Sequence, residues 1–598
     1  MSFNDRLAKV LDEIATLLEL SGGDRFRVNA HAKAARTLRD TTTDLEPIAD
    51  DPKALTALDG IGKGMAEKIG EFKRTGKLED HESLLAEVPS GLLDVMGVQG
   101  LGPKTVRAMW KELNVTDLDG LKRVIKSGEL ATLPRMGAKA VEKIKTGLKF
   151  LESTGTRTHI GVAMPVAERV VEFMRTVDGV QRADFAGSLR RGKETIGDID
   201  VLCVADEPKR AHEAFRSMEG VVDVIAAGER KSSVRLSAGE GYGRWKGFEP
   251  EGGLTLQVDL RTVPAKSWGA ALMYFTGSKE HNVKMREKAL AKGLTLNEYG
   301  LFPDEEPDAG PPQDRGIEPV ASEDEEKVYA KLELAWVPPE MREDRGELMI
   351  DATPELLTVE DIKAELHAHT TASDGKLELE QLAQAAIDRG FHTLAVTDHS
   401  KSSAQAGGLN ETRLAEQAEV IARANEALPE ITIMKGSEVD ILADGSLDFD
   451  DDTLAALDVV VASPHVALDQ DPKKATKRLL KAIENPCVHI LGHPTGRIIS
   501  RRPGLQPAMD EIIAAAKEHD VALEINSHWL RLDLRDTHVR AAVEAGVKIA
   551  IDCDVHAESD YDNLRFGVVT GRRGWLTKDL CVNAWSKTKL HKWLRSKR

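Results

Sequence analysis

The chain has 598 residues and a formal net charge of −18, and this length predicts several domains instead of one. Proteins that bind nucleic acid are often basic, so the charge argues mildly against that class, although local basic patches still bind phosphate. The cysteines are scattered and form no Cys-x-x-Cys pair, which fits a reducing compartment and excludes a thiolate zinc site. There is no apolar leader and no apolar run long enough to span a bilayer, so we expect a cytoplasmic protein without membrane contact.

Residues 4–150 show apolar residues at helical spacing, separated by short turns. Two of the turns, Leu58–Lys63 and Val98–Lys104, contain a Gly-x-Gly pair directly before a helix-forming run. Such a turn exposes backbone N–H groups at a helix N-terminus, where they bind phosphate without reading bases. A single turn of this kind is usually an ordinary helix connection, but repetition with a trailing lysine favours binding to the DNA backbone. The residues predicted to contact DNA are Gly60, Gly62, Gly100, Gly102 and Lys104.

These units resemble helix-hairpin-helix motifs, and the run Gly60–Leu78 also looks like the small amino-terminal domain of family X DNA polymerases. The resemblance implies that Lys68 matches the lysine that forms a Schiff base in deoxyribose-phosphate lyase chemistry. We therefore expect a helical, lyase-like DNA-binding domain over residues 1–85 and a second helix-hairpin-helix domain over residues 86–150.

The next motif is Gly187-Ser188-Leu189-Arg190-Arg191-Gly192, followed by Gly197-Asp198-Ile199-Asp200-Val201. Side chains alternate along a strand, so Asp198 and Asp200 point the same way, and Asp259 adds a third carboxylate in an apolar, strand-like run. Three carboxylates on neighbouring strands can hold two Mg²⁺ ions for in-line nucleotidyl transfer. The Gly-Ser turn can bring backbone N–H groups against a triphosphate that Arg191 neutralises. A lone Asp-x-Asp is usually a solvated acidic turn, but the surrounding residues favour a catalytic site.

An aromatic pair followed by a glycine, Tyr274-Phe275-Thr276-Gly277, offers a flat wall and a close backbone approach for the sugar of a nucleotide. The alternative is that both aromatic residues belong to the core. The resemblance to family X DNA polymerases becomes specific at these motifs and covers residues 1–340. We expect a nucleotidyltransferase-like palm over residues 151–262 and a nucleotide- and template-binding subdomain over residues 263–340.

The resemblance also implies a role for each residue of this half. Asp198, Asp200 and Asp259 would bind Mg²⁺, and Asp259 would help to activate the primer 3′-hydroxyl. The triphosphate would lie against Gly187, Ser188 and Arg191, and the sugar against Tyr274, Phe275 and Gly277. The base edge would be read by Asn282, and Arg286 would contact the template strand.

Two segments without regular patterns follow. Residues 303–326 are rich in Asp, Glu and Pro, which predicts a solvated loop. Residues 341–360 are interpreted as a linker.

Strand and helix patterns alternate over residues 361–598. The expected strands are Ile362–Leu366, Thr393–Thr397, Thr432–Gly436, Val459–Ala462, Val488–Leu491, Ala522–Ile525 and Lys548–Ile551. Helical runs such as Leu379–Asp388 and Pro507–Glu518 lie between them. This alternation predicts a parallel sheet closed into a distorted (β/α)7 barrel, with its chemistry at the C-terminal ends of the strands.

A ligand-type residue follows nearly every one of these strands, and only Ala522–Ile525 lacks one, with Asn526 at that place. Imidazoles mixed with carboxylates suit Zn²⁺, Mn²⁺ or Fe, and the number of ligands implies two or three ions that can bridge a phosphate and generate hydroxide. Arg497 and Lys435 either neutralise the phosphate or are surface charges. The predicted metal ligands are His367, His369, Asp374, His399, Glu438, His465, His493, Asp554 and His556.

This half resembles the polymerase-and-histidinol-phosphatase (PHP) domain, and every expected ligand position is filled. The matching signatures are His367-Ala368-His369, Thr397-Asp398-His399-Ser400, Gly436-Ser437-Glu438, Ser463-Pro464-His465, Gly492-His493-Pro494 and Asp554-Val555-His556. The resemblance implies an active phosphoesterase, with Mn²⁺-dependent 3′–5′ exonuclease activity and room for 3′-phosphatase or abasic-site endonuclease activity.

Together the two halves look like a bacterial family X DNA polymerase with a C-terminal PHP domain, a multidomain fold of the α+β and α/β classes. We predict a gap-filling repair polymerase that binds gapped or nicked DNA and dNTPs, works as a monomer, and processes DNA 3′ ends with its barrel. Two alternatives remain: a small-molecule phosphatase with a DNA-docking N-terminal half, and a non-catalytic DNA-end scaffold.

Overall fold

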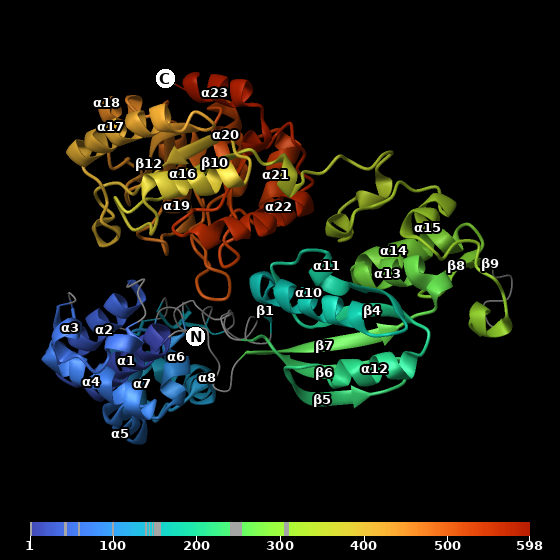
Figure 1. The fold of residues 1–598 in the computed structure, drawn as a ribbon, viewed down its shortest axis with the longest axis horizontal. Coiled ribbons are helices and arrows are strands. Elements are labelled where there is room, and N and C mark those ends of the chain that lie inside the picture. The colour runs from blue at the N-terminus through green and yellow to red at the C-terminus, as the bar shows by residue number, and fades with distance from the viewer. Residues whose placement is uncertain are drawn as a thin grey trace. The chain divides into compact units, whose positions relative to one another are not determined.

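A computed structural model describes residues 3–40, 45–57, 60–98, 101–134, 136–137, 140–142, 144–145, 148, 157–239, 254–303 and 310–597. The chain divides into two compact units, residues 1–156 with 238–254, and residues 157–237 with 255–598. Figure 1 shows the helices of the first unit in blue and the elements of the second from cyan to red. The expected classes, a helical N-terminal region, a mixed sheet and a parallel barrel, are confirmed.

The first unit is built from helices around one apolar core. Leu7, Leu11, Ile14 and Leu18 recur at helical spacing in the first helix and are all buried. Its helices are α1 (Phe3–Ser21), α2 (Arg25–Asp40), α3 (Pro52–Thr56), α4 (Lys63–Thr75), α5 (Glu79–Glu87), α6 (Gly91–Met96), α7 (Pro103–Leu113) and α8 (Leu118–Ser127).

The second unit begins with a five-stranded mixed sheet in the order β2-β4-β7-β6-β5. Figure 1 shows α10 (Ile160–Thr176) and α12 (Pro208–Arg216) lying against this sheet. β4 and β7 are parallel neighbours, and their register sets Asp200 opposite Asp259. The sheet therefore puts the predicted carboxylates side by side. Its strands are β2 (Val180–Phe185), β4 (Ile199–Ala205), β5 (Val221–Ala227), β6 (Lys231–Ser237) and β7 (Thr255–Thr262).

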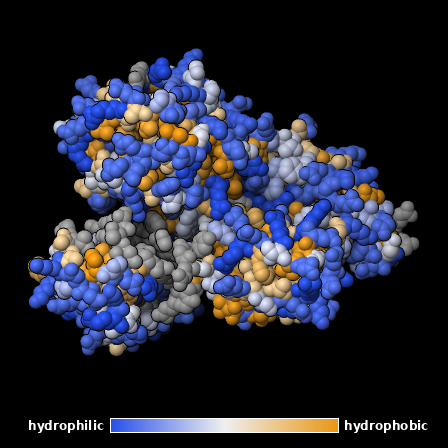
Figure 2. Space-filling view, in the orientation of Figure 1, coloured by the Kyte–Doolittle hydropathy of each residue, from blue (hydrophilic) through white to orange (hydrophobic). Residues whose placement is uncertain are grey.

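β5 is one of the two edge strands of this sheet, and it carries exposed apolar side chains. Val222, Val224 and Ile225 are all exposed, and Figure 2 shows hydrophobic surface where β5 lies.

The segment after the sheet contains a buried ionic cluster that corrects one prediction. Glu325, expected in a solvated loop, is only 7% exposed, because Arg190 and Arg342 both donate to its carboxylate at 2.8 and 2.6 Å. The segment interpreted as a linker also buries charge, since Glu347 accepts from His281 at 2.6 Å with both side chains fully buried. The elements here are α13 (Trp268–Thr276), α14 (Lys279–Leu290), β8 (Leu294–Asn297), β9 (Gly300–Pro303) and α15 (Glu325–Lys331).

The C-terminal part is a barrel of seven parallel strands that follow one another in chain order. A parallel bridge between Ala368 and Val555 joins the first strand to the residues after the last one, so the barrel is nearly closed. The strands are β10 (Ala364–Ala368), β11 (Thr393–Val396), β12 (Thr432–Asp440), β13 (Val459–Ser463), β14 (Ile490–Leu491), β15 (Ala522–Asn526) and β16 (Ile549–Asp552). The helices are α16 (Leu379–Asp388), α17 (Glu411–Ala427), α18 (Asp451–Ala455), α19 (Pro472–Ile483), α20 (Met509–Glu518), α21 (Asp536–Ala545), α22 (Leu564–Arg573) and α23 (Lys587–Arg595).

One face of β15 changes from apolar to polar along the length of the strand. On β15, Ala522 packs in a buried cluster with Trp593 of α23, while Glu524 and Asn526 follow on the same face because side chains alternate. The apolar start of the strand stabilises the barrel, and its polar end faces the predicted ligands.

Candidate active sites

The first candidate site is the carboxylate cluster on β4 and β7. Ligand oxygens of Asp198, Asp200 and Asp259 all lie within 4.8 Å of one another. Asp198 is exposed and the other two are half-buried, so the cluster is open to solvent on one side. Lys231 pairs with Asp259 at 3.1 Å, and Gln257 donates to the other oxygen of that carboxylate at 3.0 Å.

The electrostatics of this cluster fit a divalent cation. Burial, together with the charges of Asp198 and Asp259, raises the pKa of Asp200 to about 6. Burial also acts to raise the pKa of Asp259, but hydrogen bonds from Gln257 and Lys231 leave it below its usual value. The electrostatic repulsion among three carboxylates is relieved by a bound hard cation, and carboxylate oxygens are ligands that suit Mg²⁺.

The glycine of the turn before β4 is required by its close approach to this cluster. Gly187 has a φ of +65°, and a Cβ atom there would lie 2.3 Å from Oδ2 of Asp200. The turn backbone is fixed to the strand by a hydrogen bond from the Ala186 N–H to the Asp200 carbonyl at 2.8 Å. The predicted triphosphate turn, with Ser188 half-buried in it, therefore lies directly beside the acidic cluster.

The turn is also fastened to the segment predicted to hold the sugar. Arg190 donates to Oγ1 of Thr276 at 3.0 Å, and Arg191 donates to the carbonyl of Thr276 at 2.8 Å. Thr276 ends α13, the helix that carries Tyr274 and Phe275. The two segments predicted to bind one nucleotide are thus hydrogen-bonded to each other. Arg191 is paired at the same time with Glu343 at 3.0 Å.

The residues predicted to contact sugar, base and template lie on α13 and α14. Tyr274, Phe275 and Gly277 are half-buried, so the aromatic pair is not simply core. The side-chain amide of Asn282 donates to the carbonyls of Tyr274 at 2.7 Å and Gly277 at 3.3 Å, which closes the end of α13. Arg286 is exposed on α14. The contacts of Asn282 and Arg286 with DNA remain predictions.

The second candidate site gathers all nine predicted ligands of the barrel. Their ligand atoms form four groups, each within 4.8 Å: His369, Asp374, His399 and His556; His367, His369 and Asp554; His367, Glu438 and His493; and His399, Glu438 and His465. Glu438 and three of the histidines belong to more than one group. Shared ligands are what a cluster of two or three adjacent ions requires.

Buried polar atoms without a well-aligned hydrogen bond indicate that this centre is built for metal. In the described part of the chain, Nδ1 of His369 is buried with neither a hydrogen-bond nor an ion-pair partner. Nε2 of His367 and Oε2 of Glu438 are buried without an aligned hydrogen bond and face other members of the cluster at 3.3 and 2.8 Å. A buried polar atom without a partner costs free energy, which a metal ion at that atom would remove. The left-handed φ of 53° at Asp554 is a further sign of strain held at a functional position.

The protonation of the barrel histidines differs within the cluster. Burial, together with the neighbouring His556 and His399, lowers the pKa of His369 to about 4. For His465 burial acts in the same direction, but the Glu438 and Asp440 carboxylates overcome it and raise the pKa to about 10. Metal binding at His465 therefore has to displace a proton.

Two residues that support the ligands, Glu524 and Asp440, are missed by the sequence analysis. Glu524 accepts from Nδ1 of His367 at 2.6 Å, and Asp440 from Nδ1 of His465 at 2.5 Å. Asn526, named above only for its place after the strand, donates to Asp554 at 2.9 Å. Such partners orient ligand rings and raise their basicity. The sequence feature that could have identified Glu524 is its position as a single glutamate inside the apolar run of β15, the one strand after which no ligand was predicted.

The two cations considered near the barrel centre have partners elsewhere. Arg497 is 4% exposed and pairs with Glu194 at 2.7 Å. The Nζ atom of Lys435 donates to the carbonyl of Ala456 at 3.4 Å. These contacts do not support a phosphate role for either residue.

The first unit presents two glycine turns at helix starts. Gly62 precedes α4 and Gly102 precedes α7, and a Cβ atom at either position would meet nothing within 4 Å. That open space allows a phosphate to approach the helix N-termini. Lys104 is exposed in the first turn of α7. Gly100 lies outside the described residues.

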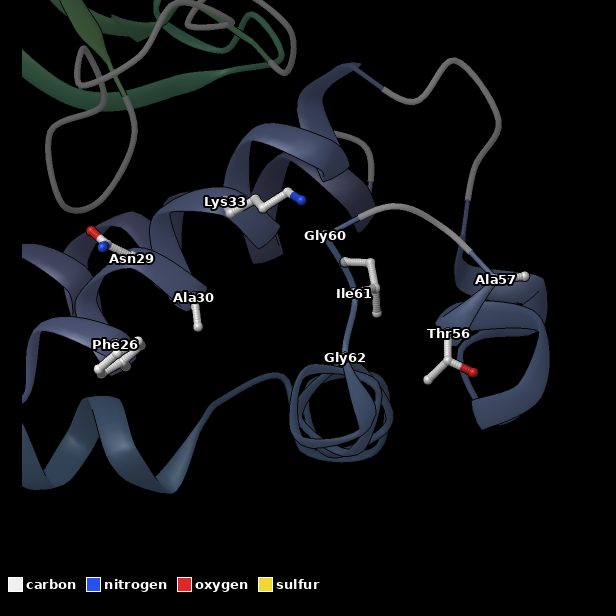
Figure 3. Close-up of a pocket in the computed structure, with 9 residues that line it drawn as sticks. All are labelled: Phe26, Asn29, Ala30, Lys33, Thr56, Ala57, Gly60, Ile61 and Gly62. Atoms are coloured by element: carbon white, nitrogen blue, oxygen red, sulfur yellow. The ribbon is translucent and has the colours of Figure 1, made fainter.

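A pocket of about 720 Å³ borders the first of these turns. Figure 3 shows Phe26 and Lys33 projecting from α2 opposite Gly60 and Gly62. Phe26 is 84% exposed, which is unusual for an aromatic side chain. Lys68, on α4, pairs with Asp80 at 2.6 Å and is 18% exposed.

In the part of the chain that the structure describes, none of the helices is both long enough and apolar enough to cross a membrane.

Comparison with known families matches four parts of the chain. Residues 2–78 match a helix-hairpin-helix domain, residues 92–149 a SAM-like helix-hairpin-helix tandem, residues 271–343 the DNA polymerase beta thumb, and residues 365–528 the PHP domain.

Three curated proteins cover different shares of the chain. The chain is 37% identical over 579 residues to a DNA polymerase/3′-5′ exonuclease PolX of Bacillus subtilis, covering 97% of both proteins. DNA polymerase lambda of Arabidopsis thaliana is 26% identical over 348 residues, which are 57% of this chain and 62% of that protein. A probable phosphatase of Thermoanaerobacter is 28% identical over 247 residues, 39% of this chain and 94% of that protein.

Proposed function

The chain belongs to the bacterial family X DNA polymerases that carry a C-terminal PHP domain, and we propose that its two ligand clusters perform separate reactions of this family. It is a DNA polymerase that fills gaps and carries 3′–5′ exonuclease activity. We assign nucleotide addition to Asp198, Asp200 and Asp259, and the removal of 3′-terminal nucleotides to the nine-ligand centre of the barrel. The observation that carries the assignment is that two separate groups of metal-ligating side chains converge in one unit.

For nucleotide addition, we infer that the three carboxylates hold two Mg²⁺ ions, which would activate the primer 3′-hydroxyl and offset the charge of the triphosphate. Gly187 and Ser188 place backbone N–H groups toward the triphosphate, and Arg191 adds positive charge. Because Arg190 and Arg191 bind Thr276, the triphosphate turn and the sugar-binding end of α13 keep a fixed spacing. Tyr274, Phe275 and Gly277 would line the sugar pocket, with Asn282 and Arg286 at the base and template.

For 3′-end processing, we infer that the barrel ligands hold two or three Zn²⁺, Mn²⁺ or Fe ions, which would generate a hydroxide near neutral pH. Glu524 and Asp440 hold the His367 and His465 rings in the orientation and tautomer suited to metal binding. The deeply buried ligands exclude water from one side of the centre, so the substrate phosphate has to approach from the other.

We further propose gapped or nicked DNA and dNTPs as partners, bound by Gly60, Gly62, Gly100, Gly102 and Lys104 together with the thumb, and a monomeric state. The domains would follow the boundaries expected above. The free cysteines fit a cytoplasmic location. Lyase chemistry at Lys68 stays a prediction.

The decisive experiment compares Asp200→Asn and His369→Ala with the unaltered protein. Gapped DNA with a labelled primer is incubated with Mg²⁺ or Mn²⁺, with and without dNTPs. We expect Asp200→Asn to reduce nucleotide addition by about 1,000-fold and to spare nucleotide removal, and His369→Ala to do the reverse. If both changes abolish the same activity, the assignment to two sites is wrong.

Two added measurements, hydrolysis of a chromogenic phosphate ester and DNA binding in EDTA, separate the two alternatives. A small-molecule phosphatase would hydrolyse a chromogenic phosphate ester but add no nucleotide. A DNA-end scaffold would show neither activity, and EDTA would leave its DNA binding unchanged.

A further inference from the structure

One loop of the barrel carries a cation to the edge of the nine-ligand centre. This loop, residues 527–534, is named the β15 loop here because it leaves β15 and returns onto the same strand. The Asn526 N–H donates to the Asp533 carbonyl at 2.7 Å, and the Leu534 N–H donates to the Glu524 carbonyl at 2.8 Å. The Asp533 carboxylate accepts from the N–H and the hydroxyl of Thr495 at 3.0 and 2.9 Å. The loop is therefore fixed at both ends.

The cation is Arg531. Its Nε atom lies 4.0 Å from Oδ2 of Asp554, which is too long for a direct hydrogen bond, and its side chain is 24% exposed. Its backbone N–H donates to the His528 carbonyl at 2.7 Å, which sets the direction of the side chain. Among the residues that the structure describes, no atom accepts a hydrogen bond from the guanidinium. A guanidinium has five N–H donors, so this one has its donors available for a ligand.

Arg531 lies on the open side of the centre. His367 and His369 are fully buried and Glu438 is 1% exposed, so one side of the ligand set is closed. Asp374 and His556, by contrast, are 37% and 31% exposed. A phosphate can reach the ligands only where they are exposed. Arg531 is 24% exposed and lies beside Asp554, which is itself only 9% exposed but is 3.6 Å from Nδ1 of the exposed ligand His556.

The other arginines around the β15 loop are already bound. Arg497 pairs with Glu194 and also donates to the Leu532 carbonyl. Arg502 donates through Nε to the carbonyl of Gly496 at 2.9 Å. Arg531 differs from both because, among the described residues, its guanidinium has no hydrogen-bond acceptor and its ion-pair partner within 4.0 Å is Asp554, a predicted ligand of the centre.

We propose that Arg531 is the phosphate-binding residue of the barrel centre and takes the non-bridging oxygens of a phosphodiester or terminal phosphate at a DNA 3′ end. This inference rests on the proposed phosphoesterase function of the barrel. A planar guanidinium binds two phosphate oxygens at once, and its charge opposes the negative charge that grows during the reaction.

The reaction that Arg531 assists is a hydrolysis. The oxygen of water forms a bond to phosphorus, and the bond from phosphorus to the 3′-oxygen of the preceding nucleotide breaks. That 3′-oxygen takes a proton and becomes the new 3′-hydroxyl, while a nucleoside 5′-monophosphate leaves. Arg531 keeps its protons throughout and acts by charge and hydrogen bonding.

The test uses the full chain with Arg531→Ala and Arg531→Lys, and Arg540→Ala as the matched control. Arg540 is 22% exposed, lies on α21 of the same barrel, and pairs with Glu544 at 2.7 Å. Nucleotide release from a 3′-labelled primer is measured with Mn²⁺, together with inhibition by inorganic phosphate, bound metal by mass spectrometry, and dNTP incorporation.

We expect Arg531→Ala to lower the kcat/KM of nucleotide release by about 100-fold or more, since the loss of one hydrogen-bond donor to the transition state has that effect in other enzymes. The inhibition constant of inorganic phosphate should rise at least tenfold, and Arg531→Lys should recover part of both losses. Bound metal, dNTP incorporation and all properties of Arg540→Ala should stay within about twofold.

Two outcomes overturn the inference. In the first, Arg531→Ala releases nucleotides and responds to phosphate as the unaltered protein does. In the second, it loses bound metal, which would make Arg531 a structural support of the ligands. His369→Ala run in parallel separates this from a failure of the proposed function, because an active His369→Ala variant would remove the phosphoesterase assignment itself.

Discussion

Replacing Gly187 with alanine would place a Cβ atom 2.3 Å from Oδ2 of Asp200, about 1 Å short of ordinary contact, which begins at 3.4 Å. The turn backbone is tied to β4, so the carboxylate has to move by roughly that distance. A left-handed φ of +65° adds strain of about 1–2 kcal/mol for a residue with a side chain. A displacement of about 1 Å at a catalytic group costs about 100-fold in rate. We therefore expect kcat for nucleotide addition to fall about 100-fold.

The assay is single-nucleotide incorporation into gapped DNA, with nucleotide release by the barrel as a check on folding. Gly197→Ala is the matched control, because Gly197 lies in the same segment but its Cβ atom would meet only Nη1 of Arg157, at 3.5 Å. The reasoning is refuted if Gly187→Ala keeps its rate within about threefold, or if Gly197→Ala is equally impaired.

Three further predictions concern buried partners. Glu524→Gln replaces the carboxylate that accepts a hydrogen bond from His367 at 2.6 Å, so the barrel should bind Mn²⁺ about tenfold more weakly by titration calorimetry. An unchanged affinity would show that Glu524 does not support His367 as a metal ligand. Burial alone would raise the pKa of Glu325, but Arg342 and Arg190 lower it from 4.5 to about 2. The ionised Glu325 therefore stabilises the folded protein by about 3 kcal/mol above pH 4.5, and this stabilisation is lost as pH falls toward 2. The difference in Tm between Glu325→Gln and the unaltered protein should accordingly shrink below pH 4.5, and a gap that does not depend on pH would count against the ion pairs. Lys68→Ala should abolish borohydride trapping on a 5′-deoxyribose-phosphate end, whereas undiminished trapping would assign that chemistry to another amine.

Much of the fold and both ligand clusters could be predicted from local pattern. The seven strands of the barrel all lie within a few residues of their expected positions, and α16 spans the expected Leu379–Asp388. Strand ends are local features of a sequence, and the C-terminal ends of parallel strands meet at one end of a barrel. For that reason His367 and His493 could be placed in one cluster although 126 positions separate them in the numbering.

The segments judged by composition were predicted less well. Residues 303–326 are acidic and proline-rich, and composition alone predicts solvent for them. The charge of Glu325 is instead compensated by two arginines, one of them 135 residues away. Composition reports what a segment contains, while burial of a charge depends on which partner reaches it.

Residue types and spacings along the chain were sufficient to predict which carboxylates and imidazoles gather into the two clusters, because each stands at a strand position that can be recognised locally. Only the tertiary structure decided the partners of the site residues. Glu524 accepts from His367 across 157 residues, and Glu343 pairs with Arg191 across 152. Arg531 lies beside Asp554 at the edge of the centre. The physical reason is distance. A hydrogen bond or ion pair acts over a few ångströms, and nothing in a linear sequence states which distant residues folding brings that close.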